Sequence, residues 1–271
     1  MRLSRVTRIV LAVFVTAVIL FLMVPLAVIT LFAFDASNVQ TFPIHHWTTS
    51  WFSVAWHDPA VRSALWLSVK AGVVATVIAL VLGVLVAFGI HRFRFFGRES
   101  VSLMLVLPIA LPGIVTGLAL QSAFNLVGTP FSIYTIIIGH ATFCIVVVFN
   151  NVVARLRRTS DSLIEASADL GARPWQTFRL VTFPVLRTAV VAGALLAFAL
   201  SFDEVIVTTF TAGAQNTLPL WIFGAIRLGQ QLPEVNAVVV SVVALTLIPI
   251  AYAAKISSSD QTRISDDRPA H

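Results

Sequence analysis

RLRRTSDSLIEASADLGARPWQTFRLVTFPVLR, residues 155–187, is a polar stretch that separates two long apolar segments. It contains six arginines, so it must project into water. Ser162-Leu163-Ile164-Glu165 has the form of a capping box and predicts a helix that starts near Ser162. Gly171 follows the helical run Glu165–Leu170, where a left-handed cap is expected. The pattern therefore predicts one short helix and a tight corner.

A second short helix is predicted after the corner. Pro174 suits its first turn, Trp175–Leu180 forms its body, and Pro184 is expected to stop it. A helix, a corner and a helix between two apolar segments would present a defined surface on one side of a membrane.

Composition places the chain outside the class of soluble domains. Of its 271 residues, 58% are hydrophobic and 11% are charged, with a mean hydropathy of +0.93. A soluble domain carries about 25% charged residues. The net charge of +6 is gathered at the ends of apolar runs, which indicates membrane topology and not a nucleic-acid surface. Cys144 is the only cysteine, so the chain cannot form an internal disulfide.

Six apolar segments reach the roughly 20 residues that a membrane-spanning helix needs. They are Ile9–Phe34, Ala64–Ile90, Leu103–Val127, Phe131–Val153, Thr188–Phe210 and Val235–Ile256. The first has 26 residues, too many for the apolar core of a signal peptide, and is predicted to be an uncleaved span. The predicted fold class is all-α, a polytopic membrane protein with six transmembrane helices.

The basic residues are distributed unequally between the two sides of these spans. One side carries most of them: Arg2, Arg5, Arg8, Arg92, Arg94, Arg98, the six arginines of 155–187, Lys255, Arg263 and Arg268. The other side carries Arg62 and Arg227, with Lys70 just inside the second span. Because cytoplasmic loops are enriched in Lys and Arg, both termini and the 155–187 loop are predicted to be cytoplasmic.

Small residues and prolines predict how the spans pack. The second span has Ala or Gly at every fourth position, namely Ala71, Ala75, Ala79, Gly83 and Ala87. Such a face lets helix backbones approach closely in lipid. Pro108 and Pro112 are expected to bend or interrupt the start of the third span, either around a pathway or merely around a packed kink.

The histidines offer little support for a metal site. His45, His46 and His57 lie in an external segment rich in tryptophan, which is typical of an interfacial aromatic belt. Few carboxylates and no cysteine accompany them, so no metal site is predicted. His140, inside the fourth span, is expected to serve as a structural hydrogen-bonding group.

Two carboxylates, Asp203 and Glu204, fall inside the apolar fifth span. Charges there cost roughly 2.5–3.5 kcal/mol each on insertion scales and mark pathways or partners. At helical spacing Glu204 shares a polar face with Ser201, Thr208 and Thr211. Two interpretations stay open: a substrate pathway formed by Ser201, Asp203, Glu204 and Thr208, or an ion pair with Lys70 or Arg227.

The polar stretch resembles the EAA loop of bacterial ABC-importer permeases. That pattern is Glu-Ala-Ala, three residues, Gly, nine residues and Ile-x-Leu-Pro, and the spacing from Glu165 to Pro184 agrees with it throughout. Ser167, Val181 and Phe183 are conservative departures. The resemblance implies the type I ABC-importer permease (MetI-like) fold and a helix that couples to a separate ATPase subunit. The coupling residues it implies are Glu165, Ala166, Ser167, Leu170, Gly171 and Pro184.

A narrower resemblance extends over most of the chain. The sequences SFDE and TTF (201–204 and 208–210), LPL (218–220) and PEVN (233–236) are similar to the second permease subunit of spermidine/putrescine-type importers. VLPIALPGIVTGLAL in the third span and GHATFC in the fourth span resemble the same subfamily. This implies a small cationic substrate, although related permeases carry opines or aminophosphonates. It also implies a second permease subunit, two copies of the ATPase and an external substrate-binding protein.

These expectations define the predicted organisation. Residues 1–62 form an N-terminal span and external segment, 63–256 the permease core with its loop at 155–187, and 257–271 a disordered cytoplasmic tail. No Gly-rich phosphate loop with Lys occurs, so the chain is expected to be no enzyme and to bind no cofactor, with ATP held by the partner subunit. The predicted location is the bacterial plasma membrane. A stand-alone secondary transporter and an intramembrane enzyme built on His140, Asp203 and Glu204 are the alternatives.

Overall fold

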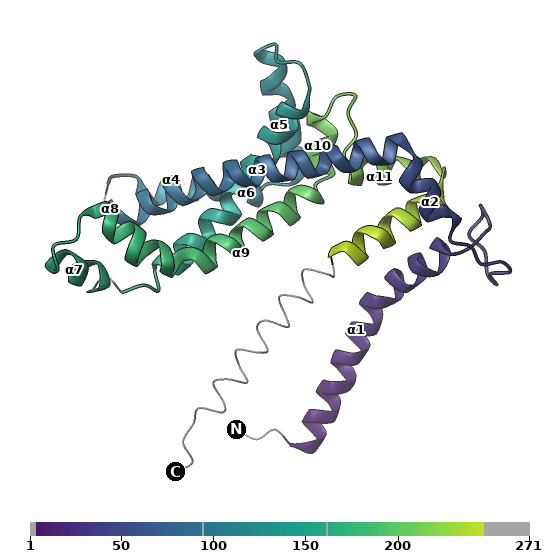
Figure 1. The fold of residues 1–271 in the computed structure, drawn as a ribbon, viewed down its shortest axis with the longest axis horizontal. Coiled ribbons are helices and arrows are strands. Elements are labelled where there is room, and N and C mark those ends of the chain that lie inside the picture. Colours follow the sequence, from purple (N-terminus) through teal and green to yellow (C-terminus); the bar gives the residue numbers. More distant parts are fainter. Residues whose placement is uncertain (1–3, 94, 161, 247–271) are drawn as a thin grey trace. The chain divides into compact units, whose positions relative to one another are not determined.

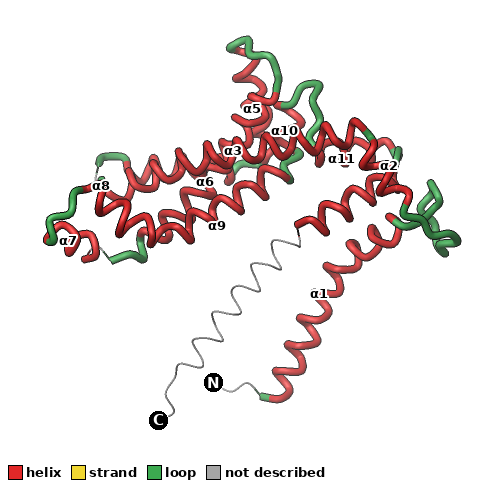
Figure 2. Tube along the Cα trace, viewed as in Figure 1, coloured by secondary structure: helices red, strands yellow, loops and turns green. Residues whose placement is uncertain are grey.

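The computed structural model describes residues 4–93, 95–160 and 162–246. These residues form helices joined by loops, as Figure 2 shows in red and green. The predicted tail 257–271 and the end of the sixth predicted span lie outside the described residues, as do Arg2, Arg94, Lys255, Arg263 and Arg268. Contacts divide the chain into two compact units, residues 1–59 with 224–271 and residues 60–223.

The first unit begins with α1 (Arg5–Ala33), which matches the first predicted span (Figure 1). Ser4 caps it, because its hydroxyl accepts a hydrogen bond from the backbone N–H of Thr7 at 3.1 Å. The following loop is anchored by Asp35, whose backbone carbonyl accepts a hydrogen bond from the indole N–H of Trp51 in α2 (Ser50–His57) at 2.8 Å.

A helix over Leu232–Thr246 completes the described part of this unit and begins the sixth predicted span. Glu234, near its start, is only 4% exposed and shares a hydrogen bond with the Asp58 side chain. Its Oε1 has no hydrogen-bond partner among the described residues. Burial, and then the neighbouring Asp58 carboxyl, raise the pKa of Glu234, which lies just before the predicted span Val235–Ile256.

The second unit is built on three long helices that lie along one another in Figure 1: α3 (Pro59–Arg92), α6 (Ile133–Leu156) and α9 (Phe183–Phe202). The predicted small-residue face of α3 is confirmed as a packing seam, because its five members are all buried: Ala71, Ala75, Ala79, Gly83 and Ala87. A side chain at Gly83 would lie 3.0 Å from the backbone carbonyl oxygen of Ile145 in α6. The seam therefore lets the two backbones approach to a distance that a larger residue would prevent.

The third predicted span is interrupted at Pro112, as predicted, whereas Pro108 lies within the first of its two helices. It forms α4 (Arg98–Ala110) and α5 (Gly113–Leu126), which meet at 104° (Figure 1). Pro112 sits at the N-cap of α5 and leaves Leu111 extended, because a residue before proline avoids the helical region.

Among the described residues, four helices are long and apolar enough to cross a membrane: α1, α3, α6 and the continuous run Pro174–Phe202. The bent pair α4–α5 raises the number to five if it counts as one span. The short helices α7 (Ser162–Asp169) and α8 (Pro174–Thr177), the π-helix η1 (Phe178–Thr182) and α10 (Ile206–Thr211) complete the second unit. The helix α11 (Leu218–Leu228) runs from the second unit into the first.

Candidate functional site

The fifth predicted span is not one helix, contrary to the prediction of a continuous Thr188–Phe210. The helix α9 ends at Phe202, and α10 begins at Ile206. Glu204 explains the restart, because its Oε1 accepts a hydrogen bond from the backbone N–H of Val207 at 2.9 Å. A side-chain acceptor placed before a helix satisfies one of the N–H groups that lack an internal partner. The helical periodicity predicted that the Glu204 carboxylate points away from the helix axis on a polar face. In the structure it instead bonds the backbone of the following helix, α10.

His140 of α6 joins the two sides of this break. Its Nδ1 lies 2.7 Å from Ser201 Oγ in the last turn of α9, and its Nε2 lies 2.8 Å from Thr208 Oγ1 in α10. All three side chains are buried, at 1%, 2% and 0% exposure. The expected structural role of His140 as a hydrogen-bonding group agrees with these contacts.

The contacts also define the tautomer of His140. Thr208 Oγ1 donates its single hydrogen to the backbone carbonyl of Glu204 at 2.6 Å. It must therefore accept from His140, so Nε2 carries the hydrogen. In the neutral ring Nδ1 is then an acceptor, and Ser201 donates to it. Two of the four predicted pathway residues, Ser201 and Thr208, thus belong to a buried hydrogen-bond network in this chain.

The two acidic side chains differ in exposure. Asp203 is exposed at the break, and Glu204 is half-buried. Of the two open interpretations, an ion pair with Lys70 is not formed among the described residues, because the Lys70 ammonium instead lies 5.0 Å from the centre of the Trp66 ring. The break therefore holds two carboxylates with no lysine partner from α3.

The loop at 155–187 folds into the predicted helix and corner. Gly171 has φ +77°, and the N–H of Ala172 bonds the carbonyl of Ser167 at 3.1 Å, as in a Schellman cap. The helix begins at Ser162 as predicted, and among the described residues the Ser160 hydroxyl accepts a hydrogen bond from the Ser162 N–H at 3.3 Å. The corner itself is as expected.

The second helix does not stop at Pro184. The helix α8 passes through the wider turns of η1 directly into α9, where Pro184 occupies the first turn. A π-helical segment shifts the hydrogen-bond register, so it can absorb the missing donor of the proline. The loop is therefore built rigidly onto the end of the long helix α9.

One departure from the EAA pattern has a structural consequence. Ser167 is buried, and its hydroxyl lies 2.8 Å from Thr177 Oγ1, which links α7 to α8. Glu165 and Ala166 are exposed, and Leu170 is 88% exposed next to the corner. The hydrogen bond between Ser167 and Thr177 fixes α7 against α8, and the exposed Leu170 side chain leaves hydrophobic area available for a partner.

Comparison with known proteins identifies the family. The family model described as "Binding-protein-dependent transport system inner membrane component" matches residues 79–257. The chain belongs to this family of membrane permeases. The match covers the α4–α5 bend, the 155–187 loop and the break at Glu204, so these features belong to the permease's core.

Two relatives of this permease are transport proteins of Escherichia coli (strain K12). It is 34% identical over 225 residues to the putrescine transport system permease protein PotI, covering 80% of this chain and 79% of PotI. It is 31% identical over 255 residues to the spermidine/putrescine transport system permease protein PotC, covering 92% and 94%.

The fold of the permease is that of ABC-importer membrane subunits. A chain from a bacterial ABC transporter that imports the acidic polysaccharide alginate superposes with a TM-score of 0.68 at 19% identity, covering 96% of this permease and 99% of that chain. The similarity confirms the predicted all-α, multi-pass fold. Since the substrate of that transporter is an acidic polysaccharide, the fold by itself does not determine a substrate.

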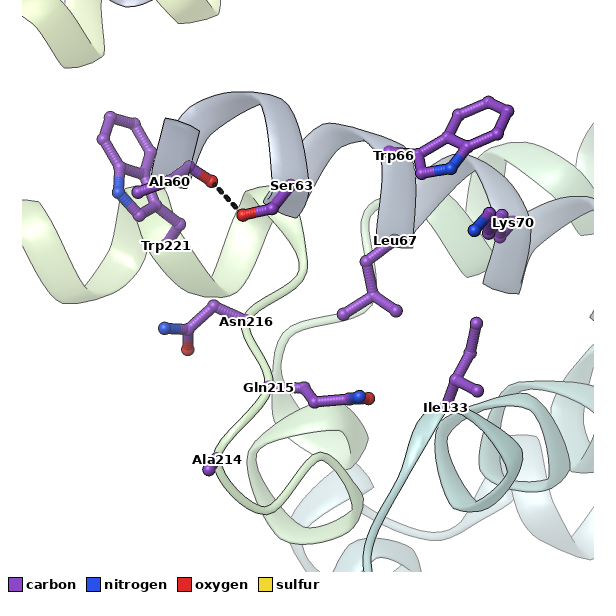
Figure 3. A pocket seen from close by; sticks show the side chains of 10 residues that line it. All are labelled: Ala60, Ser63, Trp66, Leu67, Lys70, Ile133, Ala214, Gln215, Asn216 and Trp221. Atoms are coloured by element: carbon purple, nitrogen blue, oxygen red, sulfur yellow. Dashed lines mark hydrogen bonds between the residues drawn. The ribbon is translucent and has the colours of Figure 1, made fainter. Parts of the chain in front are cut away.

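The permease also has a cavity of about 530 Å³ that the sequence did not predict, shown in Figure 3. Trp66 and Lys70 of α3 lie at one end and Trp221 of α11 at the other, with Gln215 and Asn216 from the loop between α10 and α11 opposite α3. These residues come from separate parts of the chain and share no local pattern, so only the tertiary structure brings them together.

Proposed function

We propose that this permease imports a polyamine of the putrescine or spermidine type. The observation that carries the proposal is the similarity to PotC along nearly the whole of both chains. Two carboxylates at the break in the fifth span support it, because ammonium groups need negative charge where water is scarce. In this proposal Asp203 and Glu204 contact the substrate, while Ser201 and Thr208 hold the break through His140.

The proposed assembly is an ATP-driven ABC importer with a second permease subunit, two ATPase subunits and an external substrate-binding protein. The surface of α7 around Glu165, Ala166 and Leu170, fixed by Ser167, Gly171 and the continuous helix at Pro184, would dock on the ATPase. ATP would be bound by that subunit, and this chain would hold no cofactor and catalyse no reaction. Both termini would face the cytoplasm, in agreement with the excess of arginines on that side.

Uptake into proteoliposomes tests the substrate. The purified four-subunit complex, supplied with its binding protein and with ATP inside the vesicles, should accumulate radiolabelled putrescine or spermidine. Omission of ATP or of the binding protein should abolish uptake. Uptake of 2-aminoethylphosphonate or an opine in place of the polyamines would overturn the proposed substrate class, while the proposal that the complex is an ABC importer would stand.

The alternative is a stand-alone transporter. Polyamine accumulation by the purified chain alone, driven by an ion gradient, would overturn the ABC assembly. Recovery of the ATPase with the tagged permease from membranes supports the assembly without depending on the substrate.

A further inference from the structure

The cavity shown in Figure 3 contains one kind of charge. Lys70 is the one charged side chain among the described residues that line it. Its ammonium group lies over the Trp66 ring and has no carboxylate partner among the described residues. A cationic polyamine would be repelled from such a site, so the cavity does not suit the proposed substrate.

The other polar groups of the cavity are available for hydrogen bonds. The amides of Gln215 and Asn216 are exposed on the loop between α10 and α11 and bond no other described residue. The same holds for the indole N–H groups of Trp66 and Trp221. The Lys70 cation at one end of the cavity, with neutral amide donors across from α3, is complementary to a carboxylate carried on an apolar stem.

The position of the cavity indicates where its ligand comes from. Lys70 lies 22 residues before Arg92 in α3, or about 33 Å along the helix at 1.5 Å per residue. If Arg92 marks the cytoplasmic edge, Lys70 reaches the outer edge of a hydrocarbon core of about 30 Å. The cavity therefore faces the external side, where an acidic group of another protein can enter.

We infer that this cavity receives an acidic side chain of the external substrate-binding protein. The inference rests on the proposed importer and adds a contact to it. A lipid phosphate would need only the ammonium and an indole N–H. The two exposed amides each offer a donor and an acceptor, which suits the carboxylate and backbone of a docked protein segment.

A titration with the binding protein tests the inference. The complex is placed in nanodiscs of neutral lipid, and the concentration of loaded binding protein that half-saturates ATP hydrolysis is measured. Lys70→Gln removes the charge and should raise this concentration at least tenfold, whereas Lys70→Arg should stay within about threefold of the unsubstituted complex. Raising the salt concentration should weaken docking less in Lys70→Gln than in the unsubstituted complex.

Arg62→Gln is the matched control. Arg62 lies eight residues away on the same helix, is exposed and does not line the cavity. It should leave the half-saturating concentration within twofold. An equal change in both variants would show a general charge effect and overturn the inference, as would no change in Lys70→Gln.

A lipid ligand gives a different result. If the effect of Lys70→Gln appears only when anionic lipid is added, the cavity holds a headgroup and the docking inference is overturned. Assembly is verified for each variant by recovery of the ATPase, and polyamine uptake at saturating binding protein is measured separately. A failure of docking at Lys70 is thereby distinguished from a failure of the proposed transport function.

Discussion

The break between α9 and α10 should depend on both nitrogens of His140. Replacement by Leu puts an apolar side chain of comparable length in place of the imidazole and removes the bonds to Ser201 and Thr208. The two partners are affected differently. Thr208 retains its bond to the Glu204 carbonyl, whereas Ser201 loses the only acceptor that the described residues offer it.

The magnitude follows from the two bonds. A net hydrogen bond contributes about 0.5–1.5 kcal/mol in a protein and averages about 0.6 kcal/mol between membrane helices. Two bonds give about 1–3 kcal/mol, and a buried unsatisfied Ser201 hydroxyl places the expected loss in the upper half of that range. Since 1.4 kcal/mol is a factor of ten, His140→Leu should raise the unfolded fraction by one to two orders of magnitude.

Two conservative variants separate the bonds. His140→Gln can place an amide N–H near the position of Nε2 and keep the bond to Thr208. His140→Asn can place an amide oxygen near Nδ1 and keep the bond to Ser201. Each should lose about half as much stability as His140→Leu, as measured by the thermal unfolding midpoint of the purified complex in one detergent.

A double-mutant cycle provides the decisive measurement. Ser201→Ala should cost about 1 kcal/mol in the unsubstituted chain and close to nothing in the His140→Gln background, where its partner is already absent. Full additivity of the two substitutions would refute the shared bond. Equal stability of His140→Leu and the unsubstituted chain would refute the role of His140 at the break.

The other predictions concern the loop, the acidic pair and Glu234. Gly171→Val should abolish binding-protein-stimulated ATP hydrolysis while the chain still inserts, because φ +77° disfavours a β-branched residue by at least about 1–2 kcal/mol. The control is Gly128→Val, at φ +66° in a different loop, which carries the same backbone strain and should retain the stimulated ATP hydrolysis. Glu204→Gln keeps the acceptor for the Val207 N–H but removes the charge, so polyamine uptake should fall more than tenfold with the complex assembled; unchanged uptake would make the acid structural. Asp203→Asn, exposed at the break, should lower uptake without lowering the unfolding midpoint. Glu234→Gln should raise the unfolding midpoint near neutral pH and have no effect below about pH 4, since a carboxyl with a raised folded-state pKa favours the folded state only at pH values below its titration; a midpoint difference that is independent of pH would contradict this assignment.

The sequence by itself determined the membrane character, the long apolar segments and the local corners. An apolar run of 20 or more residues is a local property, and the bilayer sets the length it must reach. The break at Pro112 and the left-handed Gly171 were predictable because each depends on the backbone chemistry of one or two residues. The small-residue face of α3 was likewise readable from its four-residue spacing.

The tertiary structure alone decided how the polar groups are used. His140 meets Ser201 and Thr208 across 61 and 68 residues of sequence, and no local pattern specifies which hydroxyls a buried imidazole will bind. Whether α9 continues through Glu204 depends on competition between a helical turn and a side-chain cap, which local sequence does not decide and packing against α6 does. The cavity at Lys70 arises in the same way, because α3, α11 and the preceding loop contribute its walls only once the helices have packed.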